Sequence, residues 1–219
     1  MNKKILAELL TYSQNKIERI TPEYIKETFD VEIHKKYERL EDYVEAIDNL
    51  VLDQYFSKHW QMDMKKWKYS GLQLIDEVNS LKPRAVLDVG CGYNEFKGKI
   101  KHLTGIDPYN AHADWKIALQ DYQTKIRYDV ILCLGSVNFG SRSKIEAEVD
   151  KCVNLLEKGG TMFFRVNPGV QHDKPQARWI EFFAWNVPFI IEQAEKHGLK
   201  ILDIRDDTNQ RKYFVLRKI

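Results

Sequence analysis

The sequence predicts an α/β protein with a doubly wound, mainly parallel β-sheet and a helical N-terminal extension. Residues 1–82 place apolar side chains at helical spacing and contain no strand-like run. From residue 85 onward, short apolar runs alternate with helical patterns, as expected of βαβ units. Several of these runs end in an aspartate or a glycine. We therefore expect two parts, a helical extension or cap over 1–82 and a sheet domain over 83–219.

The helices of the extension are marked by caps and apolar stripes. Thr21 is a predicted N-cap, with Pro22 at the first helical position. A helical face is predicted from the spacing of Leu40, Tyr43, Val44, Ile47, Leu50 and Val51. A further apolar stripe, stopped by Pro83, consists of Leu74, Ile75, Val78 and Leu81.

Seven strands are expected in the sheet domain, and the last two form a hairpin. Their predicted ranges are 85–89, 103–107, 116–119, 128–134, 161–166, 199–204 and 212–216. Little sequence separates Asp107 from the third range, so the helix between these strands is expected to be short or missing.

Two helices are expected on the sheet. Ser143 and Glu146 form a predicted capping box for the first, and Gly159–Gly160 are predicted to end it. The second is predicted from Val187–Pro188 to near Gly198.

The composition limits the class of protein. The chain has 219 residues, 43% of them hydrophobic and 30% charged, with a net charge of +2, so no global polycation points to nucleic acid. Its three cysteines show no paired spacing, which argues against a disulfide framework or a zinc site. No apolar run of about 18 residues and no signal-peptide pattern is present. We expect a cytoplasmic protein with no membrane association and no metal.

The glycine turn after the first predicted strand is the most informative stretch. It reads Ala85-Val-Leu-Asp88-Val-Gly90-Cys91-Gly92-Tyr93-Asn94. Glycines here let backbone N–H groups approach a ligand closely. The dinucleotide fingerprint G-x-G-x-x-G needs a small residue at position 95, which is Glu. A purely structural strand-to-helix turn remains an alternative.

This arrangement resembles the first motif of the class I S-adenosylmethionine (SAM) dependent methyltransferases, in which an acidic residue precedes the first glycine by two, as Asp88 does. The third glycine of that motif is Asn94 here, and Asn tolerates the left-handed backbone region. The wider pattern also resembles small methyltransferase-like proteins encoded by bacteriophages. The resemblance covers about residues 85–219 and implies a Rossmann-like seven-stranded sheet with its last strand antiparallel.

The resemblance also implies a SAM site at the carboxyl ends of the strands. There, Asp88 is expected to hold the ammonium group, Asp107 the ribose hydroxyls and Asp121 the adenine amino group, with Tyr122 or Tyr109 stacking nearby. The complete expected cofactor set is Asp88, Gly90, Cys91, Gly92, Asp107, Pro108, Asp121, Tyr122 and Gly135.

Each of these aspartates also has a structural interpretation. Asp107 with Pro108 can simply open a turn. Asp121 can be a solvated loop residue, and Asp88 can hold its own loop by accepting backbone N–H bonds.

Candidate acceptor-binding groups follow the fourth and fifth predicted strands. Asn138 comes after the fourth, and Arg165 and Asn167 come at the end of the fifth. His172 is a candidate general base, although an exposed loop histidine is commonly only solvated. The segments lack the Asn/Asp-Pro-Pro-aromatic and Pro-Cys signatures of DNA-methylating enzymes.

Residues 55–69 interleave aromatic side chains with lysines, from Tyr55 through Met62 to Tyr69. Such a segment can bind nucleic acid by stacking and phosphate contacts. Alternatively, Trp60, Met64 and Trp67 form one helical face packed on the sheet. A third interpretation is a lid over the cofactor.

Three functions remain open from the sequence. The first is a SAM-dependent methyltransferase with SAM as cofactor and an undefined, small-molecule acceptor. The second is a nucleic-acid methyltransferase that uses residues 55–69. The third is a catalytically degenerate SAM-binding interaction protein, which the Asn94 substitution would fit. The acceptor and the oligomeric state are not determined by the sequence.

Overall fold

A computed structural model describes residues 1–61 and 63–219, which form two units. The helical unit comprises Met1–Gln61, Phe139–Ser141 and Gln171–Phe182, and the sheet unit comprises Met62–Asn138, Arg142–Val170 and Phe183–Ile219. By contacts, residues 63–82 belong with the sheet, so a functional boundary after residue 82 stays a prediction. Within the described residues, no helix is long and apolar enough to span a bilayer.

The helical unit contains the helices α1 (Lys3–Ser13), α2 (Pro22–Phe29) and α3 (Leu40–Gln54), the π-helical turn η2 (Tyr55–His59), and the 3-10 turns η1 (Ile17–Arg19) and η4 (Pro175–Ala177). The predicted cap is confirmed: the Thr21 hydroxyl accepts from the Tyr24 N–H at 3.2 Å, and Pro22 is the first helical residue. The predicted stripe of α3 is confirmed as well, since Tyr43, Val44, Ile47 and Val51 are all buried.

Asn2 connects three parts of the helical unit. Its side-chain oxygen caps α1 by accepting from the N–H groups of Lys4 and Ile5. Its Nδ2 donates to Asp48 Oδ1 on α3 at 2.7 Å and to the Trp179 carbonyl at 2.8 Å. A side chain that is 1% exposed therefore joins α1, α3 and the segment 171–182.

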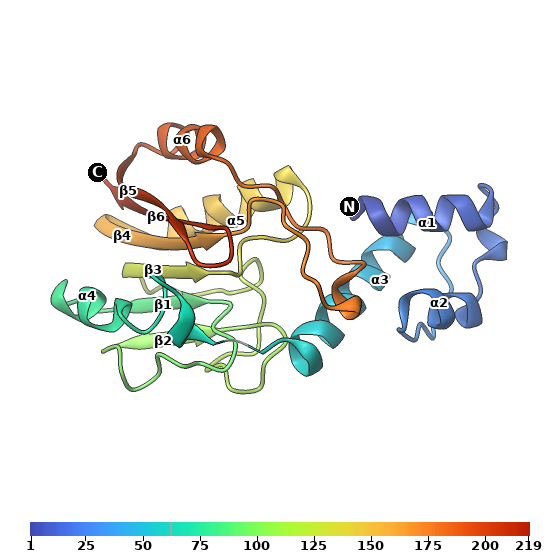
Figure 1. The fold of residues 1–219 in the computed structure, drawn as a ribbon, viewed down its shortest axis with the longest axis horizontal. Coiled ribbons are helices and arrows are strands. Elements are labelled where there is room, and N and C mark those ends of the chain that lie inside the picture. The colour runs from blue at the N-terminus through green and yellow to red at the C-terminus, as the bar shows by residue number, and fades with distance from the viewer. Residues whose placement is uncertain (62) are drawn as a thin grey trace. The chain divides into compact units, whose positions relative to one another are not determined.

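The sheet unit has six strands in the order β2-β1-β3-β4-β6-β5, and Figure 1 shows β2, β1, β3 and β4 side by side. The strands are β1 (Val86–Val89), β2 (Leu103–Ile106), β3 (Tyr128–Leu134), β4 (Leu156–Val166), β5 (Leu199–Asp207) and β6 (Arg211–Lys218). The helices are α4 (Leu74–Ser80), α5 (Arg142–Leu155) and α6 (Val187–Lys196), with the 3-10 turn η3 (Met64–Lys66). The last strand, β6, is antiparallel to both of its neighbours, as predicted.

The third predicted strand, at 116–119, is wrong, so the sheet has six strands instead of seven. Side chains occupy the edge of β2 where this strand would pair. Asp114 Oδ2 accepts from the Gly105 N–H at 2.8 Å, and the Lys97 ammonium donates to the Leu103 carbonyl at 3.0 Å. Lys97 and Asp114 also form an ion pair at 2.7 Å, and Trp115 adds a single parallel bridge to β2. The Lys97–Asp114 ion pair and Trp115 thus bond backbone groups at the edge of β2 that a further strand would otherwise pair with.

Removing the Asp114 carboxylate is expected to weaken this edge. Asp114→Ala leaves the partly buried Gly105 N–H without its acceptor and removes the charge partner of Lys97, at a cost of about 1–3 kcal/mol. Burial acts to raise the pKa of Asp114, but the Gly105 N–H and Lys97 outweigh it and lower the pKa. The stabilisation is therefore present above about pH 4 and is lost as the pH falls.

Urea unfolding at pH 7 and pH 3 measures this effect. The matched control is Glu95→Ala, which breaks only a surface contact with Lys99 at 3.5 Å and should cost less than about 0.5 kcal/mol. Equal losses from the two substitutions at pH 7 would contradict the edge role of Asp114.

Alternate residues of the strands build two cores, one on each face of the sheet. On one face, α5 and α6 pack against residues such as Ile131, Cys133 and Phe164. On the other, α4 and the segment around Trp67 pack against Val130, Leu132 and their neighbours. This two-sided burial is why β1 and β3 are almost continuously apolar, and it confirms the doubly wound prediction.

Two predicted helix ends are corrected. The helix α5 begins at Arg142, so Ser143 lies inside it rather than at the cap, and Glu146 pairs with Arg142 at 2.8 Å. Gly159 and Gly160 do not end this helix but lie within β4, which starts directly at Leu156 and is longer than predicted. A Cβ on Gly160 would lie 3.0 Å from the Asp129 carbonyl oxygen, so the glycine permits close approach to β3.

Candidate functional site

The carboxylate of Asp88 is buried in β1, just before the glycine turn. Asp88 is only 4% exposed. Burial, assisted by the negative charge of Asp107, raises its pKa to about 7, and no hydrogen-bond donor among the described residues offsets this. The structure therefore does not support the interpretation that Asp88 holds its own loop. Its carboxylate is suited to a cationic partner.

The turn after β1 lies close to the end of β3. Gly90 and Cys91 donate their N–H groups to the Ile106 carbonyl at 2.8 and 3.1 Å. Gly90 has a φ of +67°, and a Cβ on it would lie 2.3 Å from the Cβ of Ser136. Only glycine fits here, both for its backbone conformation and for the approach of the loop after β3.

Asn94 adopts the conformation expected of the missing third glycine. Its φ is +57°, and its Nδ2 donates to the His112 carbonyl at 3.0 Å. Its Oδ1 lies against Gly105, where a Cβ would be 2.6 Å away. The prediction that Asn preserves the turn is confirmed, so this substitution does not by itself disrupt the loop.

Asp107 is engaged by three backbone donors. Its Oδ1 accepts from the N–H groups of Tyr109 (2.8 Å) and Asn110 (2.9 Å), and its Oδ2 accepts from the Gly92 N–H (3.0 Å). The turn-opening interpretation is therefore correct for Oδ1. A carboxylate has about four acceptor positions, so in this arrangement Asp107 retains room for one further donor on Oδ2.

The loop after β3 contributes a hydroxyl that the sequence reasoning did not single out. Gly135 has a φ of +112° and faces open space. The Oγ of Ser136 is buried and has no hydrogen-bond partner among the described residues. An unsatisfied buried hydroxyl beside Gly90 is a candidate donor to a ligand; the Gly-Ser step at a strand end was the available signal.

The remaining cofactor candidates lie in the segment between β2 and β3. Pro108 is half-buried within the Asp107 turn, and Asp121 is exposed in a short turn. Tyr122 is 7% exposed, and its hydroxyl lies 2.8 Å from that of Tyr128 inside the sheet core. These contacts favour core packing for Tyr122, and cofactor binding by any of the three stays a prediction.

Asn138 and Asn167 join the ends of β3 and β4 to each other. Asn138 Oδ1 accepts from the Asn167 N–H at 2.7 Å. The Asn167 Oδ1 accepts from the N–H groups of Gly169 and Val170, and its Nδ2 donates to the Val170 carbonyl. Backbone groups thus occupy both amides, which gives them a positioning role; direct acceptor binding stays a prediction.

Arg165 lies in a buried cluster at the end of β4. Its Nε is 3.3 Å from Asp207 Oδ2, its Nη2 donates to the Thr208 carbonyl at 3.0 Å, and its guanidinium lies 4.1 Å from the centre of the Trp67 ring. Burial lowers the pKa of Arg165 to about 10 even though Asp207 opposes this. These contacts make Arg165 part of the scaffold, and its role towards an acceptor stays a prediction.

His172 belongs to the helical unit. Its Nδ1 lies 2.9 Å from the Tyr55 hydroxyl, and its ring packs 4.5 Å from that of Phe182. The neighbouring Lys174 donates to the His59 carbonyl at 2.5 Å. His172 is therefore held against the π-helical turn η2 and is not a free loop residue; its role as a base stays a prediction.

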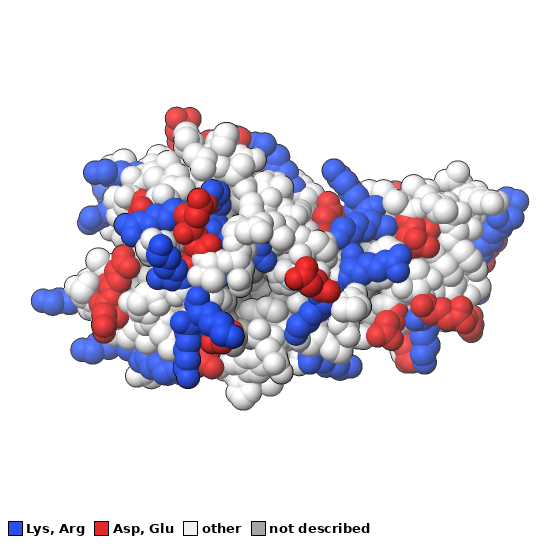
Figure 2. Space-filling model, in the orientation of Figure 1, with Lys and Arg blue, Asp and Glu red and all other residues white. Residues whose placement is uncertain are grey.

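Residues 55–69 do not form the predicted helical face. Residues 55–59 are π-helical, 64–66 form a 3-10 turn, and Trp60 and Trp67 are extended; Met62 lies outside the described residues. Tyr55 (2% exposed) and Trp67 (9%) are buried, so they offer no open stacking surface. On the face shown in Figure 2, acidic and basic side chains are interspersed. In the described part of this segment, these contacts give the nucleic-acid interpretation no support.

Solved structures with a similar fold are SAM-dependent methyltransferases. A SAM-dependent methyltransferase from Clostridium acetobutylicum has a TM-score of 0.52 at 16% identity, over 81% of this chain and 98% of its own. The 1,6-didemethyltoxoflavin-N1-methyltransferase of Burkholderia thailandensis, with bound 1,6-didemethyltoxoflavin and S-adenosylhomocysteine, has a TM-score of 0.59 at 13% identity, over 85% and 93%. The chain has the class I methyltransferase fold.

A third structure agrees with this methyltransferase fold. SAM-bound CalS10, an amino pentose methyltransferase from Micromonospora echinaspora, has a TM-score of 0.53 at 13% identity, over 85% of this chain and 100% of its own. No family model and no curated protein matches the chain. At these identities the likeness shows the fold, and the chemistry has to be argued from the site.

Proposed function

We propose that the protein is a SAM-dependent methyltransferase that transfers a methyl group to a small-molecule acceptor. The observation that carries the proposal is the buried Asp88 carboxylate, without a donor among the described residues, beside a turn that only glycine fits. An ammonium group supplies the missing cation, and close backbone approach suits a ligand lying along the turn.

The residues fit the cofactor in the following way. Asp88 would hold the ammonium, the Gly90–Gly92 backbone would lie along the methionine part, and the Ser136 hydroxyl would donate to the carboxylate. The free position on Asp107 Oδ2 would accept one ribose hydroxyl rather than two. Bound SAM supplies an electrophilic methyl group, and the protein then needs chiefly to orient the acceptor and exclude water.

A small-molecule acceptor is supported by two similar structures. One is named for a toxoflavin precursor and the other for an amino pentose. The burial of Tyr55 and Trp67 adds some support, because it takes two aromatic rings of residues 55–69 out of reach of stacking bases.

Isothermal titration with S-adenosylhomocysteine tests the proposal. We expect binding in the micromolar range, and Gly90→Ala should weaken it at least about tenfold because its Cβ meets Ser136 at 2.3 Å. The matched control is Gly98→Ala: Gly98 has a similar φ of +76°, but its Cβ would meet nothing within 4 Å. Its affinity should stay within about threefold of the unmodified chain.

Ser136→Ala is a second variant, which separates loss of ligand binding from the loss of folding that Gly90→Ala could cause. It keeps the Cβ and removes a hydroxyl that has no protein partner among the described residues, so the fold should be retained while binding weakens about fivefold to tenfold. Absence of heat with both SAM and S-adenosylhomocysteine at millimolar concentration would refute the proposed function.

A further inference from the structure

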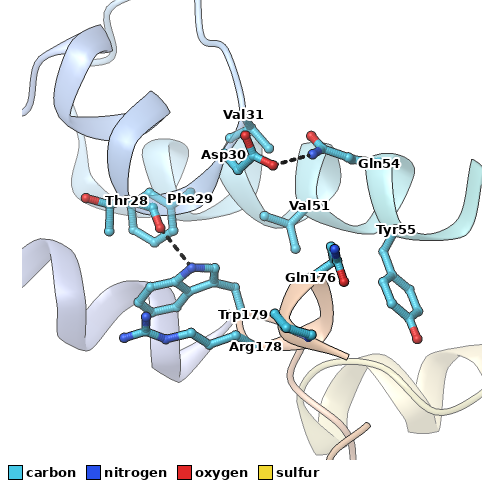
Figure 3. Close-up of a pocket in the computed structure, with 11 residues that line it drawn as sticks. Thr28, Phe29, Asp30, Val31, Val51, Gln54, Tyr55, Gln176, Arg178 and Trp179 are labelled. Carbon is cyan, nitrogen blue, oxygen red and sulfur yellow. Dashed lines mark hydrogen bonds between the residues drawn. The ribbon is translucent and has the colours of Figure 1, made fainter. Parts of the chain in front are cut away.

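The helical unit contains a cavity of about 320 Å³, at the lower end of the range of small-molecule sites. It lies entirely within this unit (Figure 3) and is formed by three segments: the end of α2, the end of α3 and the η4 segment. Its lining residues are Thr28, Phe29, Asp30, Val31, Val51, Gln54, Tyr55, Pro175, Gln176, Arg178 and Trp179.

The apolar part of the cavity wall is fixed in place. Phe29, Val31 and Val51 are each no more than 5% exposed. The Trp179 indole N–H donates to the Thr28 carbonyl at 3.0 Å, and its ring packs 4.7 Å from that of Phe29. Behind the wall, Asn2 and Lys4 bind backbone carbonyls of the η4 segment. A flat apolar group can therefore bind without the wall having to become ordered first.

The polar groups of the cavity include a single carboxylate, that of Asp30. Asp30 presents a carboxylate that accepts one hydrogen bond, from Gln54 Nε2 at 2.9 Å, which leaves most of its acceptor positions available. The one cation in the lining, Arg178, has its guanidinium 4.7 Å from the centre of the Trp179 ring. Two further cations, Lys26 and Lys58, line an adjoining cavity that shares Asp30, and Lys26 bonds Glu32 at 2.6 Å. The cavity thus combines an aromatic wall with a carboxylate whose only hydrogen-bond donor in the described structure is an uncharged amide.

We propose that this cavity binds a primary organic amine carried on a flat apolar body. The ammonium donates to Asp30, where both the charge and the acceptor positions are complementary, and the apolar body covers Trp179 and Phe29. Anionic ligands are disfavoured by the same carboxylate. This binding does not depend on methyl transfer, and it remains testable if the proposed cofactor site is wrong.

The experiment uses 2-phenylethylamine as the probe, followed through the indole N–H signal of Trp179 in two-dimensional NMR of the full chain. The signal is assigned by its disappearance in Trp179→Phe. We expect saturable shifts in the millimolar range for the amine, about fivefold weaker binding of the uncharged analogue 2-phenylethanol, and no binding of 3-phenylpropanoate.

Two variants and a control locate the site. Asp30 has a φ of +58° at the end of α2, a conformation that Asn also adopts. Asp30→Asn therefore removes the charge without disturbing the turn. It should weaken amine binding about fivefold. Gln176→Trp, at an exposed position, should block the cavity and abolish binding. Glu45→Gln removes an exposed charge from α3 away from this cavity and should leave binding unchanged.

Either of two results overturns the inference. One is equal affinity for the amine and the alcohol, which would remove the role of the carboxylate. The other is amine binding that survives Gln176→Trp, which would place the ligand elsewhere. Loss of S-adenosylhomocysteine binding in the glycine-turn variants has no bearing on these readouts, so the two proposals fail separately.

Discussion

Asp88→Asn is expected to stabilise the free protein at pH 8 while strongly weakening its affinity for S-adenosylhomocysteine. The pKa of Asp88 is about 7 in the folded chain and about 3.9 in an unfolded one. Between these values the folded protein holds a proton that the unfolded protein releases, so its stability falls as the pH rises through this window. A shift of roughly three units corresponds to at most about 4 kcal/mol lost by pH 8.

Asparagine cannot ionise, so the Asp88→Asn variant does not lose this stability as the pH rises. A buried amide without partners costs about 1–3 kcal/mol, which leaves a net gain of about 2 kcal/mol at pH 8 and none at pH 5. Urea unfolding at the two pH values measures the difference. The control is Asp121→Asn, an exposed carboxylate in the same unit, which should change neither value by more than about 0.5 kcal/mol.

Ligand binding should show the opposite pH dependence. The ammonium group of the ligand needs Asp88 ionised, so below about pH 7 the affinity for S-adenosylhomocysteine should fall by up to tenfold per pH unit. In Asp88→Asn the affinity should be at least about thirtyfold weaker at pH 8 and nearly independent of pH. If the variant binds as tightly as the unmodified chain, Asp88 does not contact the ligand.

Asp207→Ala is expected to be among the most damaging single substitutions, at about 3–5 kcal/mol. Asp207 is 6% exposed and accepts from the N–H groups of Lys68, Tyr69 and Thr208 and from the Ser70 hydroxyl. It also faces Arg165, which the substitution leaves buried without its counter-charge. Breaking a buried ion pair from one side carries a cost of this size.

The pH dependence of this cluster follows from the pKa of Asp207. Burial acts to raise the pKa, but the bonds from Ser70 and Thr208 and the charge of Arg165 outweigh it, so the pKa is lowered. The stabilisation is present above about pH 4 and is lost as the pH falls through the lowered folded-state value. Acid unfolding of Asp207→Ala should accordingly lack this step.

The neighbouring residue provides the control. Asp206 pairs with Lys212, and its side chain is 77% exposed, so Asp206→Ala should cost less than about 0.5 kcal/mol. Guanidinium unfolding of Asp207→Ala, Arg165→Met and the double variant gives the coupling between the buried pair. Additive losses would mean that Arg165 and Asp207 do not stabilise each other.

The parts of the fold visible in the sequence are those set by local patterns. The apolar runs at β1 and β3 predict buried strands because both faces of the sheet are covered, and Thr21-Pro22 predicts the start of α2 because a cap needs only neighbouring residues. The strand at 116–119 failed because its place on β2 is occupied by Lys97 and Asp114, which a local pattern does not reveal.

The candidate site shows the same division. The sequence predicts the glycine turn and the tolerance of Asn94, which depend on backbone conformation. It also allows for the turn that Asp107 opens, because Tyr109 and Asn110 follow it directly in the chain. It does not predict that the Gly92 N–H occupies the other oxygen of Asp107, or that Ser136 lies against Gly90, because these contacts join the ends of different strands. The helical face predicted for residues 55–69 was wrong for a related reason. Trp67 packs against Arg165, which follows about a hundred residues later in the chain.

The helical unit is assembled from stretches that the ribosome delivers far apart in time. Residues 1–61 are synthesised before the whole sheet. The Thr28 carbonyl, however, accepts its hydrogen bond from the indole of Trp179, 151 residues later in the chain. About 110 residues separate Gln61 from Gln171, which at about 5–20 residues per second is a delay of roughly 5–20 s. During synthesis the first three helices therefore lack part of their packing partner and stay accessible to chaperones and proteases. The unit is complete only when the last quarter of the polypeptide has been made.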